Sequence, residues 1–553
     1  MNGDYYDLGR HSFPVTTRSE EAQTWFDRGL NWCYGYNHDE AVACFDRALA
    51  ADPACAMAHW GIGYCVGPNY NKPWDAFDDD DRARSLTRMR ISVAEASRLA
   101  PAASPVEQAL IAALAGRYDV TAAADLAIRN DGYADAMRGV FRAHGDSLDV
   151  RALFAEAIMN RTPWALWDLS TGEPAEGADT AEAIEVLEAA FEGPESARAY
   201  RHPGLLHMYI HLMEMSPNPE RALKAGDALR DLVPDAGHLR HMPTHIDVLC
   251  GQYAAVVESN SRAIDADRRF LEREGAVNFY SLYRCHNYHF RIYGAMFLGQ
   301  SGVALATAEE MISTLPAELL TMPSPPMADW LEGFVPMKQH VLIRFGRWRD
   351  ILAQDLPSDP ALFCTTTAMM RYARAVAHAA LGDVTAAERE QAAFREARKT
   401  VPETRAVFNN TCRDILGVAE AMMDGEVAYR RGDHDTAFEH LREAVRRDDG
   451  LTYDEPWGWM QPTRHALGAL LMEQGRLEEA EAVYRADLGL DGTLARAYQH
   501  PDNVWSLHGL HECLTRRGET AERALIAQRL ALAQARADVT IRSSCYCRME
   551  NAA

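Results

Sequence analysis

Histidines gather in the middle of the chain at spacings that suit a metal site. Seven of them stand three or four positions from another: His207, His211, His238, His241, His245, His286 and His289. In a helix, residues three or four positions apart lie on one face. Two imidazoles on one face can bind the same transition metal ion, so we expect these residues to be metal ligands.

A carboxylate and a phenol accompany the histidines. Glu214 follows His211 by three positions, and Tyr293 follows His289 by four. Imidazole-rich sites favour transition metals over magnesium and calcium, which prefer oxygen ligands. We favour copper or iron, with zinc as the alternative, and the surplus of histidines predicts either two ions or one ion with supporting histidines. Glu214 is expected to be a ligand, a supporting residue or a general base, and Tyr293 to hydrogen-bond a substrate or ligand.

Two cysteines near the end of the chain, Cys545 and Cys547, form a second candidate group. They lie at the end of a segment, residues 537–548, that leaves the helical pattern. Their thiolates could bind a soft metal, or the two could form a redox pair. The plain alternative is an irregular tail with two incidental cysteines.

The elements that must position these residues are helices. Apolar residues recur at helical spacing along much of the chain, and no continuous β-branched alternation is present. Residues 22–53 contain Trp25, Gly29, Trp32, Ala41, Phe45, Ala48 and Pro53. This pattern resembles the tetratricopeptide repeat (TPR), in which small residues stand where two antiparallel helices approach closely.

The same unit recurs along the chain. A glycine stands five positions before a helix alanine in the pairs Gly382/Ala387, Gly432/Ala437 and Gly475/Ala480. We therefore expect an all-α fold, a right-handed α-solenoid of about ten TPR-like helix pairs, curled enough to enclose the histidines. Several separate helical bundles are the alternative.

The pattern divides the chain into five segments. They are N-terminal TPR-like pairs (1–104), an irregular helical segment (105–200), the histidine-rich units (201–320), C-terminal TPR-like units (321–536) and a non-helical tail (537–553).

The TPR resemblance implies that the first helix of each pair lines the concave face, which would turn the central histidines inward. The central stretch also resembles a group of TPR-like proteins with the motifs HxxxHxxE, AGHxxHMPxHI, HNxHF and a C-terminal SCxC. Ordinary TPR proteins are protein–protein scaffolds that grip a peptide in their groove. Their carboxylate clamps use Lys, Arg and Asn, whereas this chain has histidines at those places.

Composition excludes several functions. The chain has 553 residues and a formal charge of −24, so binding to nucleic acid or to an anionic membrane surface is not expected. Its 48% apolar content is enough for a large core. No apolar run approaches the roughly 20 residues of a membrane span, and the N-terminus does not look like a signal peptide, so we expect a cytoplasmic protein.

These patterns favour a metal-dependent enzyme, an oxidoreductase acting on a small organic molecule. A metal-dependent hydrolase or lyase could use the same ligands. A non-enzymatic TPR scaffold, a neutral groove for an acidic peptide and a purely structural histidine network are the remaining alternatives.

Overall fold

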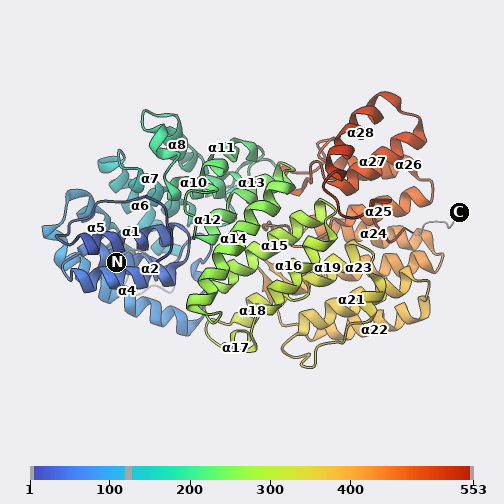
Figure 1. Ribbon diagram of the computed structural model, residues 1–553, viewed down its shortest axis with the longest axis horizontal. Coiled ribbons are helices and arrows are strands. Elements are labelled where there is room, and N and C mark those ends of the chain that lie inside the picture. Colours follow the sequence, from blue (N-terminus) through green and yellow to red (C-terminus); the bar gives the residue numbers. More distant parts are fainter. Residues whose placement is uncertain (1–4, 119–126, 549–553) are drawn as a thin grey trace. The chain divides into compact units, whose positions relative to one another are not determined.

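The computed structural model describes residues 5–118 and 127–548, and almost all regular structure in this part of the chain is helical. The chain separates into two compact units. The first comprises Met1–Ile246 and Ser261–Arg284, and the second comprises Asp247–Asn260 and Cys285–Ala553. Figure 1 shows the helices in chain order.

The first unit is built mainly from twelve successive α-helices among the described residues. They are α1 (Glu20–Tyr34), α2 (His38–Ala51), α3 (Ala56–Cys65), α4 (Asp79–Leu99), α5 (Pro105–Tyr118), α6 (Ala127–His144), α7 (Leu148–Met159), α8 (Thr180–Glu192), α9 (Ser196–Ala199), α10 (Pro203–Met213), α11 (Leu223–Leu229) and α12 (Gly237–His241). Short 3-10 helices and one small antiparallel ribbon connect them: η1 (Trp74–Ala76), η2 (Ala100–Ala102), η3 (Pro219–Ala222), β1 (Trp167–Asp168) and β2 (Glu173–Pro174).

The division between the units passes through three helices. These are α13 (Pro243–Leu249), α14 (Tyr253–Glu274) and α15 (Ser281–Phe297).

The second unit continues with further helices in sequence. They are α16 (Ser301–Ser313), α17 (Ala317–Leu320), α18 (Met327–Leu331), α19 (Met337–Arg344), α20 (Trp348–Leu352), α21 (Cys364–Ala380), α22 (Val384–Lys399), α23 (Cys412–Arg430), α24 (His434–Asp449), α25 (Thr463–Glu473), α26 (Leu477–Asp487), α27 (Val504–Arg517) and α28 (Thr520–Gln534). Its minor elements are η4 (Glu332–Phe334), η5 (Arg496–Tyr498) and the antiparallel pair β3 (Ala406–Val407) and β4 (Asn410–Thr411).

Glycines let one aromatic ring fit between successive helices. In the first unit, Phe45 of α2 lies between Gly29 of α1 and Gly61 of α3. A Cβ atom at either glycine would lie 2.6 Å from the Phe45 ring, well inside van der Waals contact. In the second unit, Gly468 and Gly509 accommodate Tyr484 of α26 in the same way. The small residues of the repeat are therefore required by the close approach of the helices.

Repeated turns separate the paired helices of the second unit. Gly382 and Gly432 have φ angles of +85° and +86°, which glycine adopts at low cost. Asp383 and Asp433 follow them and cap α22 and α24, accepting hydrogen bonds from backbone N–H groups of the first turn. Helices α21 and α22 consequently lie side by side, as do α23 and α24 (Figure 1).

These observations confirm the expected all-α solenoid of TPR-like helix pairs. The segment expected to be helical but irregular, 105–200, contains α5 to α9 and the β1–β2 ribbon. The described residues of the tail, 537–548, have no regular secondary structure. Among the described residues, no helix has the length and apolar character needed to cross a membrane. The curling of the array around the histidines stays a prediction.

Candidate functional site

Helix α10 holds the central pair of histidines in a buried environment. The helix begins at Pro203, and the side chain of His202 caps it by accepting a hydrogen bond from the Leu205 N–H (3.2 Å). His207 and His211 follow on one face, with 0% and 1% of their surface exposed. Their ring centroids are 4.7 Å apart, so the expected pairing on a single helical face is present.

Hydrogen bonds orient both rings in the same way. Nδ1 of His207 is 2.6 Å from the carbonyl oxygen of Tyr34, and Nδ1 of His211 is 2.9 Å from Oε1 of Glu214. A carbonyl or carboxylate oxygen only accepts, so each Nδ1 donates its proton. Each Nε2 therefore carries the lone pair, and neither Nε2 has a hydrogen-bond partner although both are buried.

Burial keeps these imidazoles neutral. It lowers the pKa of His207 well below its ordinary value and lowers the pKa of His211 to about 3. Neutral imidazole is the form that binds metals. At neutral pH the pair therefore presents two lone pairs ready for an ion.

Glu214 joins this pair to the next helices. Its Oε2 accepts a hydrogen bond from Nδ1 of His245 on α13 at 2.6 Å, while its Oε1 accepts from His211. The carboxylate is completely buried. Carboxylates that bind the distal nitrogen of a ligating histidine orient the ring and raise its basicity. Of the three roles expected for Glu214, this geometry favours the supporting one.

His238 and His241 complete the cluster. Candidate ligand atoms of His207, His211 and His238 all lie within 4.8 Å of one another, as do those of His211, Glu214 and His245. Nitrogens on one tetrahedral ion lie about 3.3 Å apart, given metal–nitrogen bonds of about 2.0–2.1 Å. Nε2 of His241 is 2.8 Å from Nε2 of His245, so here the two rings share a hydrogen bond. Five histidines selected from the sequence therefore lie in one cluster in the first unit: His207, His211, His238, His241 and His245.

Three tyrosines that sequence reasoning did not select as site residues surround the cluster. The ring centroids of Tyr36 and His207 are 4.6 Å apart, those of Tyr70 and His211 4.6 Å, and those of Tyr283 and His238 4.9 Å. Tyr36 and Tyr283 also line a cavity of about 100 Å³. Tyr70 lies in a loop that also contains Trp74 and Phe77, and this aromatic grouping was the one available signal in the sequence.

Tyr36 has a strained backbone. Its φ angle is +54°, unusual for a residue other than glycine. It stands in the turn between α1 and α2, and its side chain is 3% exposed. Strain of this kind is retained where the surrounding structure fixes a side chain in place. Tyr36 is thus held between the histidine cluster and the cavity.

The remaining histidine candidates belong to the second unit. His286 packs edge to face on Phe408 with ring centroids 4.9 Å apart. Nε2 of His289 lies 2.6 Å from the sulfur of Met460. The Tyr293 hydroxyl is 3.0 Å from Nε2 of His500. Participation of His286, His289 and Tyr293 in one site with α10 stays a prediction.

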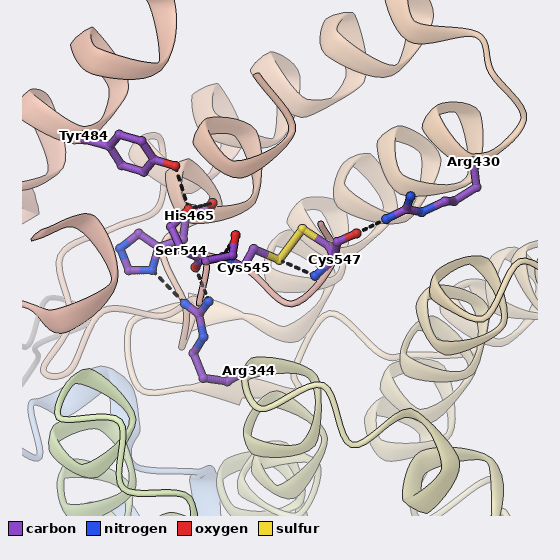
Figure 2. The surroundings of a disulfide bond; sticks show 8 residues. Arg344, Arg430, His465, Tyr484, Ser544, Cys545 and Cys547 are labelled. Carbon is purple, nitrogen blue, oxygen red and sulfur yellow. Dashed lines mark hydrogen bonds between the residues drawn. A yellow bond between two sulfur atoms is a disulfide. The ribbon is translucent and has the colours of Figure 1, made fainter. Parts of the chain in front are cut away.

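The two C-terminal cysteines are joined to each other by a disulfide bond within the second unit (Figure 2). Arg344 and Arg430 donate hydrogen bonds to the carbonyl oxygens of Ser544 and Cys547. In the disulfide the sulfurs are not thiolates, so metal binding by these cysteines requires reduction. Their roles as metal ligands or as a redox pair both stay predictions.

Side chains also hold this tail in place (Figure 2). The Ser544 hydroxyl donates to the His465 carbonyl oxygen at 2.8 Å and lies 2.7 Å from the Tyr484 hydroxyl. Arg344 also approaches Nδ1 of His465 at 2.8 Å. The tail is therefore an integral part of the second unit rather than a loose end.

Comparisons with known proteins give similarity of fold only. No family model matches the chain, and no curated protein matches it. Among solved structures, a chain of the APC/C hetero-tetramer Cut9–Hcn1 is 11% identical, with a TM-score of 0.31 and coverage of 90% of this chain and 78% of that chain. A chain of Naa15/Naa10 bound to HypK-THB is 14% identical, with a TM-score of 0.22 and coverage of 93% of this chain and 70% of that chain. Yeast Tom70 is 10% identical, with a TM-score of 0.26 and coverage of 92% of this chain and 99% of that chain. These similarities are weak, and the assignment of a helix-pair fold rests on the packing described above.

Proposed function

We propose that the first unit binds a transition metal ion through Nε2 of His207, Nε2 of His211 and the imidazole of His238. One observation carries the proposal: two buried Nε2 atoms, four residues apart on α10, have no hydrogen-bond partner while their Nδ1 atoms donate. Leaving a buried polar atom without a partner costs about 1–3 kcal/mol, and a bound metal ion removes that cost.

The donors determine which metal fits. An all-imidazole set with a supporting carboxylate suits copper or iron, with zinc as the alternative. Burial keeps His207 and His211 neutral, and their hydrogen bonds leave a lone pair on each Nε2, so binding at these two rings requires no prior loss of a buried charge. Glu214 then stabilises the tautomers of His211 and His245 that direct Nε2 away from the carboxylate.

The activity proposed for this site is oxidation of a small organic molecule. When bound, a copper or iron ion would supply the electron-transfer chemistry, with dioxygen as the oxidant that takes up the electrons and protons removed from the substrate. The neighbouring cavity, about 100 Å³ in volume, offers room for a small molecule or several waters beside the tyrosines. Tyr36 and Tyr283 both contact the histidines and line that cavity, so they would bind and orient the substrate.

Metal analysis tests the binding proposal. Full-length protein purified without a histidine tag is expected to contain stoichiometric copper or iron. The double variant His207→Ala/His211→Ala should lose it while keeping its helicity by circular dichroism. His340→Ala is the matched control, because this histidine is equally buried in the second unit and is outside the proposed set. Retention of the metal by the double variant would overturn the proposal.

The metal found also distinguishes the proposed oxidation from hydrolysis. Zinc, which has no redox chemistry, would favour a hydrolase or lyase that uses a metal-activated water.

A protein-binding scaffold is the second candidate. The helix-pair array of the second unit favours it, because stacked pairs present long surfaces suited to protein partners. The five histidines of the cluster are too buried to contact a peptide, so a partner would bind elsewhere. Absence of stoichiometric metal, with partner binding unchanged in His207→Ala/His211→Ala, would support the scaffold.

A further inference from the structure

A second group of metal-binding side chains lies where three helices of the first unit meet. Cys33 is in the last turn of α1, His38 is the first residue of α2, and Cys65 is the last residue of α3. The two sulfurs and a ring nitrogen all lie within 4.8 Å of one another, and Cys33 Sγ is 4.0 Å from Nε2 of His38. Both cysteines are buried and neither is in a disulfide.

The turn between α1 and α2 creates this group. Gly35 ends α1 by donating its N–H to carbonyl oxygens of the last turn, and Asn37 caps the start of α2. Only Tyr36 separates the two caps, so the chain reverses within three residues. Cys33 and His38, five positions apart, are consequently brought onto the same side of the turn, and the end of α3 completes the group.

Hydrogen bonding again selects the tautomer. Nδ1 of His38 is 2.8 Å from the carbonyl oxygen of Cys65, which can only accept. The amide nitrogen of Asn69 is further from Nδ1, at 3.3 Å, so the contact with Cys65 is the closer one. The proton is therefore on Nδ1, and the lone pair of Nε2 is directed toward Cys33. A backbone carbonyl that fixes the distal nitrogen is the usual support of a metal-binding histidine.

The group also has an open side. His38 and Cys65 line the cavity of about 100 Å³, together with the polar side chains of Asp39, Asn69 and Lys72. Three protein ligands with the fourth position open to water is the arrangement of catalytic zinc sites, including those with two cysteines and one histidine. A closed structural site would instead need a fourth protein ligand.

We propose that Cys33, His38 and Cys65 form a second metal site, for Zn²⁺, with a fourth coordination position that opens to the cavity. Two thiols release their protons to solvent when the ion binds, and no redox change is involved. Typical bond lengths of about 2.3 Å to sulfur and about 2.0 Å to nitrogen require only a modest contraction of the group. The site shares this cavity with the proposed copper or iron site but none of its metal ligands, so the binding of the two ions can be tested separately.

Cobalt titration tests this proposal, because thiolate ligands give Co²⁺ an intense near-ultraviolet charge-transfer band that imidazole ligands do not. The probe is Co²⁺ added to the metal-free, reduced, full-length chain in a Cys545→Ser/Cys547→Ser background. We expect one equivalent of thiolate-bound Co²⁺, displaced by Zn²⁺. Cys33→Ser and Cys65→Ser should each lose most of the band, whereas Cys44→Ser, an equally buried cysteine outside the group, should keep it.

Two further variants make the result decisive. His38→Gln leaves both thiols in place and should weaken Zn²⁺ binding at least tenfold, with helicity unchanged. His207→Ala/His211→Ala should keep the thiolate band, which separates this site from the proposed function. The proposal fails if the band is absent in the starting protein or persists in Cys33→Ser/Cys65→Ser. It also fails if Cys33 and Cys65 form a disulfide in the protein as purified under reducing conditions.

Discussion

Replacing Glu214 by glutamine tests how the central histidines are prepared for metal binding. The carboxylate accepts Nδ1–H from His211 at 2.9 Å and from His245 at 2.6 Å. A glutamine side chain of the same size offers one oxygen that accepts and one NH₂ group that only donates. One imidazole will therefore face a donor and must move its proton to Nε2. In His211 that atom is the one proposed to bind the metal, and in His245 it is the atom that contacts His241.

The size of the effect follows from these contacts. Loss of a supporting carboxylate typically weakens metal affinity 10- to 100-fold, which is about 1.4–2.7 kcal/mol. A buried hydrogen bond to a charged group contributes about 1.5–3 kcal/mol, so the metal-free protein should also be destabilised by an amount of this order. Both losses arise without removing any ligand.

Two measurements check this prediction. Chelator competition gives the copper affinity, and urea unfolding of the metal-free protein gives its stability. Glu188→Gln is the matched control, because Glu188 accepts a hydrogen bond from Tyr209 at 2.8 Å in the same unit but contacts no histidine of the cluster. Unchanged copper affinity in Glu214→Gln, or an equal loss in Glu188→Gln, would refute the reasoning.

Two other predictions concern stability. Gly61→Ala should destabilise the protein by about 1–3 kcal/mol through overpacking, because the new Cβ would meet the Phe45 ring at 2.6 Å. Gly139→Ala in α6 should instead stabilise it by up to about 1 kcal/mol, because no described atom beyond its chain neighbours and its own helix backbone lies within 4 Å of the new Cβ. Urea unfolding compares the two variants. Burial raises the pKa of Glu426 from 4.5 to about 7 in the folded protein. Between these two pH values the unfolded chain has lost this proton while the folded protein keeps it, so the free energy of unfolding falls as the pH rises. Glu426→Gln should remove about 3 kcal/mol of this pH dependence, measured by unfolding at pH 4.5 and 7.5, and an unaltered pH profile would contradict the assignment.

The helical elements and the histidine pairs could be predicted because their signals are local. Helix periodicity, the glycine–alanine spacing of the repeat and the spacing of His207 and His211 involve residues within one or two turns of each other. Side chains four positions apart share a helical face whatever surrounds them. The repeat also predicted where small residues must stand, as Gly29 shows beside Phe45.

The site tyrosines could not be predicted in the same way. Tyr36 and Tyr283 lie on separate helices or turns far apart in the chain, and they meet the histidines only through packing. Nothing in the spacing of Cys33, His38 and Cys65 resembles a known metal motif, yet the turn at Tyr36 and the end of α3 bring them together. Whether such distant residues meet depends on how the helices pack, and no short stretch of sequence specifies that packing.

The sequence by itself determined the all-α repeat and the presence of imidazoles on one face of α10. Only the tertiary structure decided what those imidazoles can do. The proton on His207 is placed by the carbonyl oxygen of Tyr34, 173 residues away along the chain. Glu214, which accepts a hydrogen bond from His211, also accepts one from His245, 31 residues further along the chain than Glu214. Burial, tautomer and charge state depend on such distant partners, because hydrogen bonds and desolvation arise from neighbours in space.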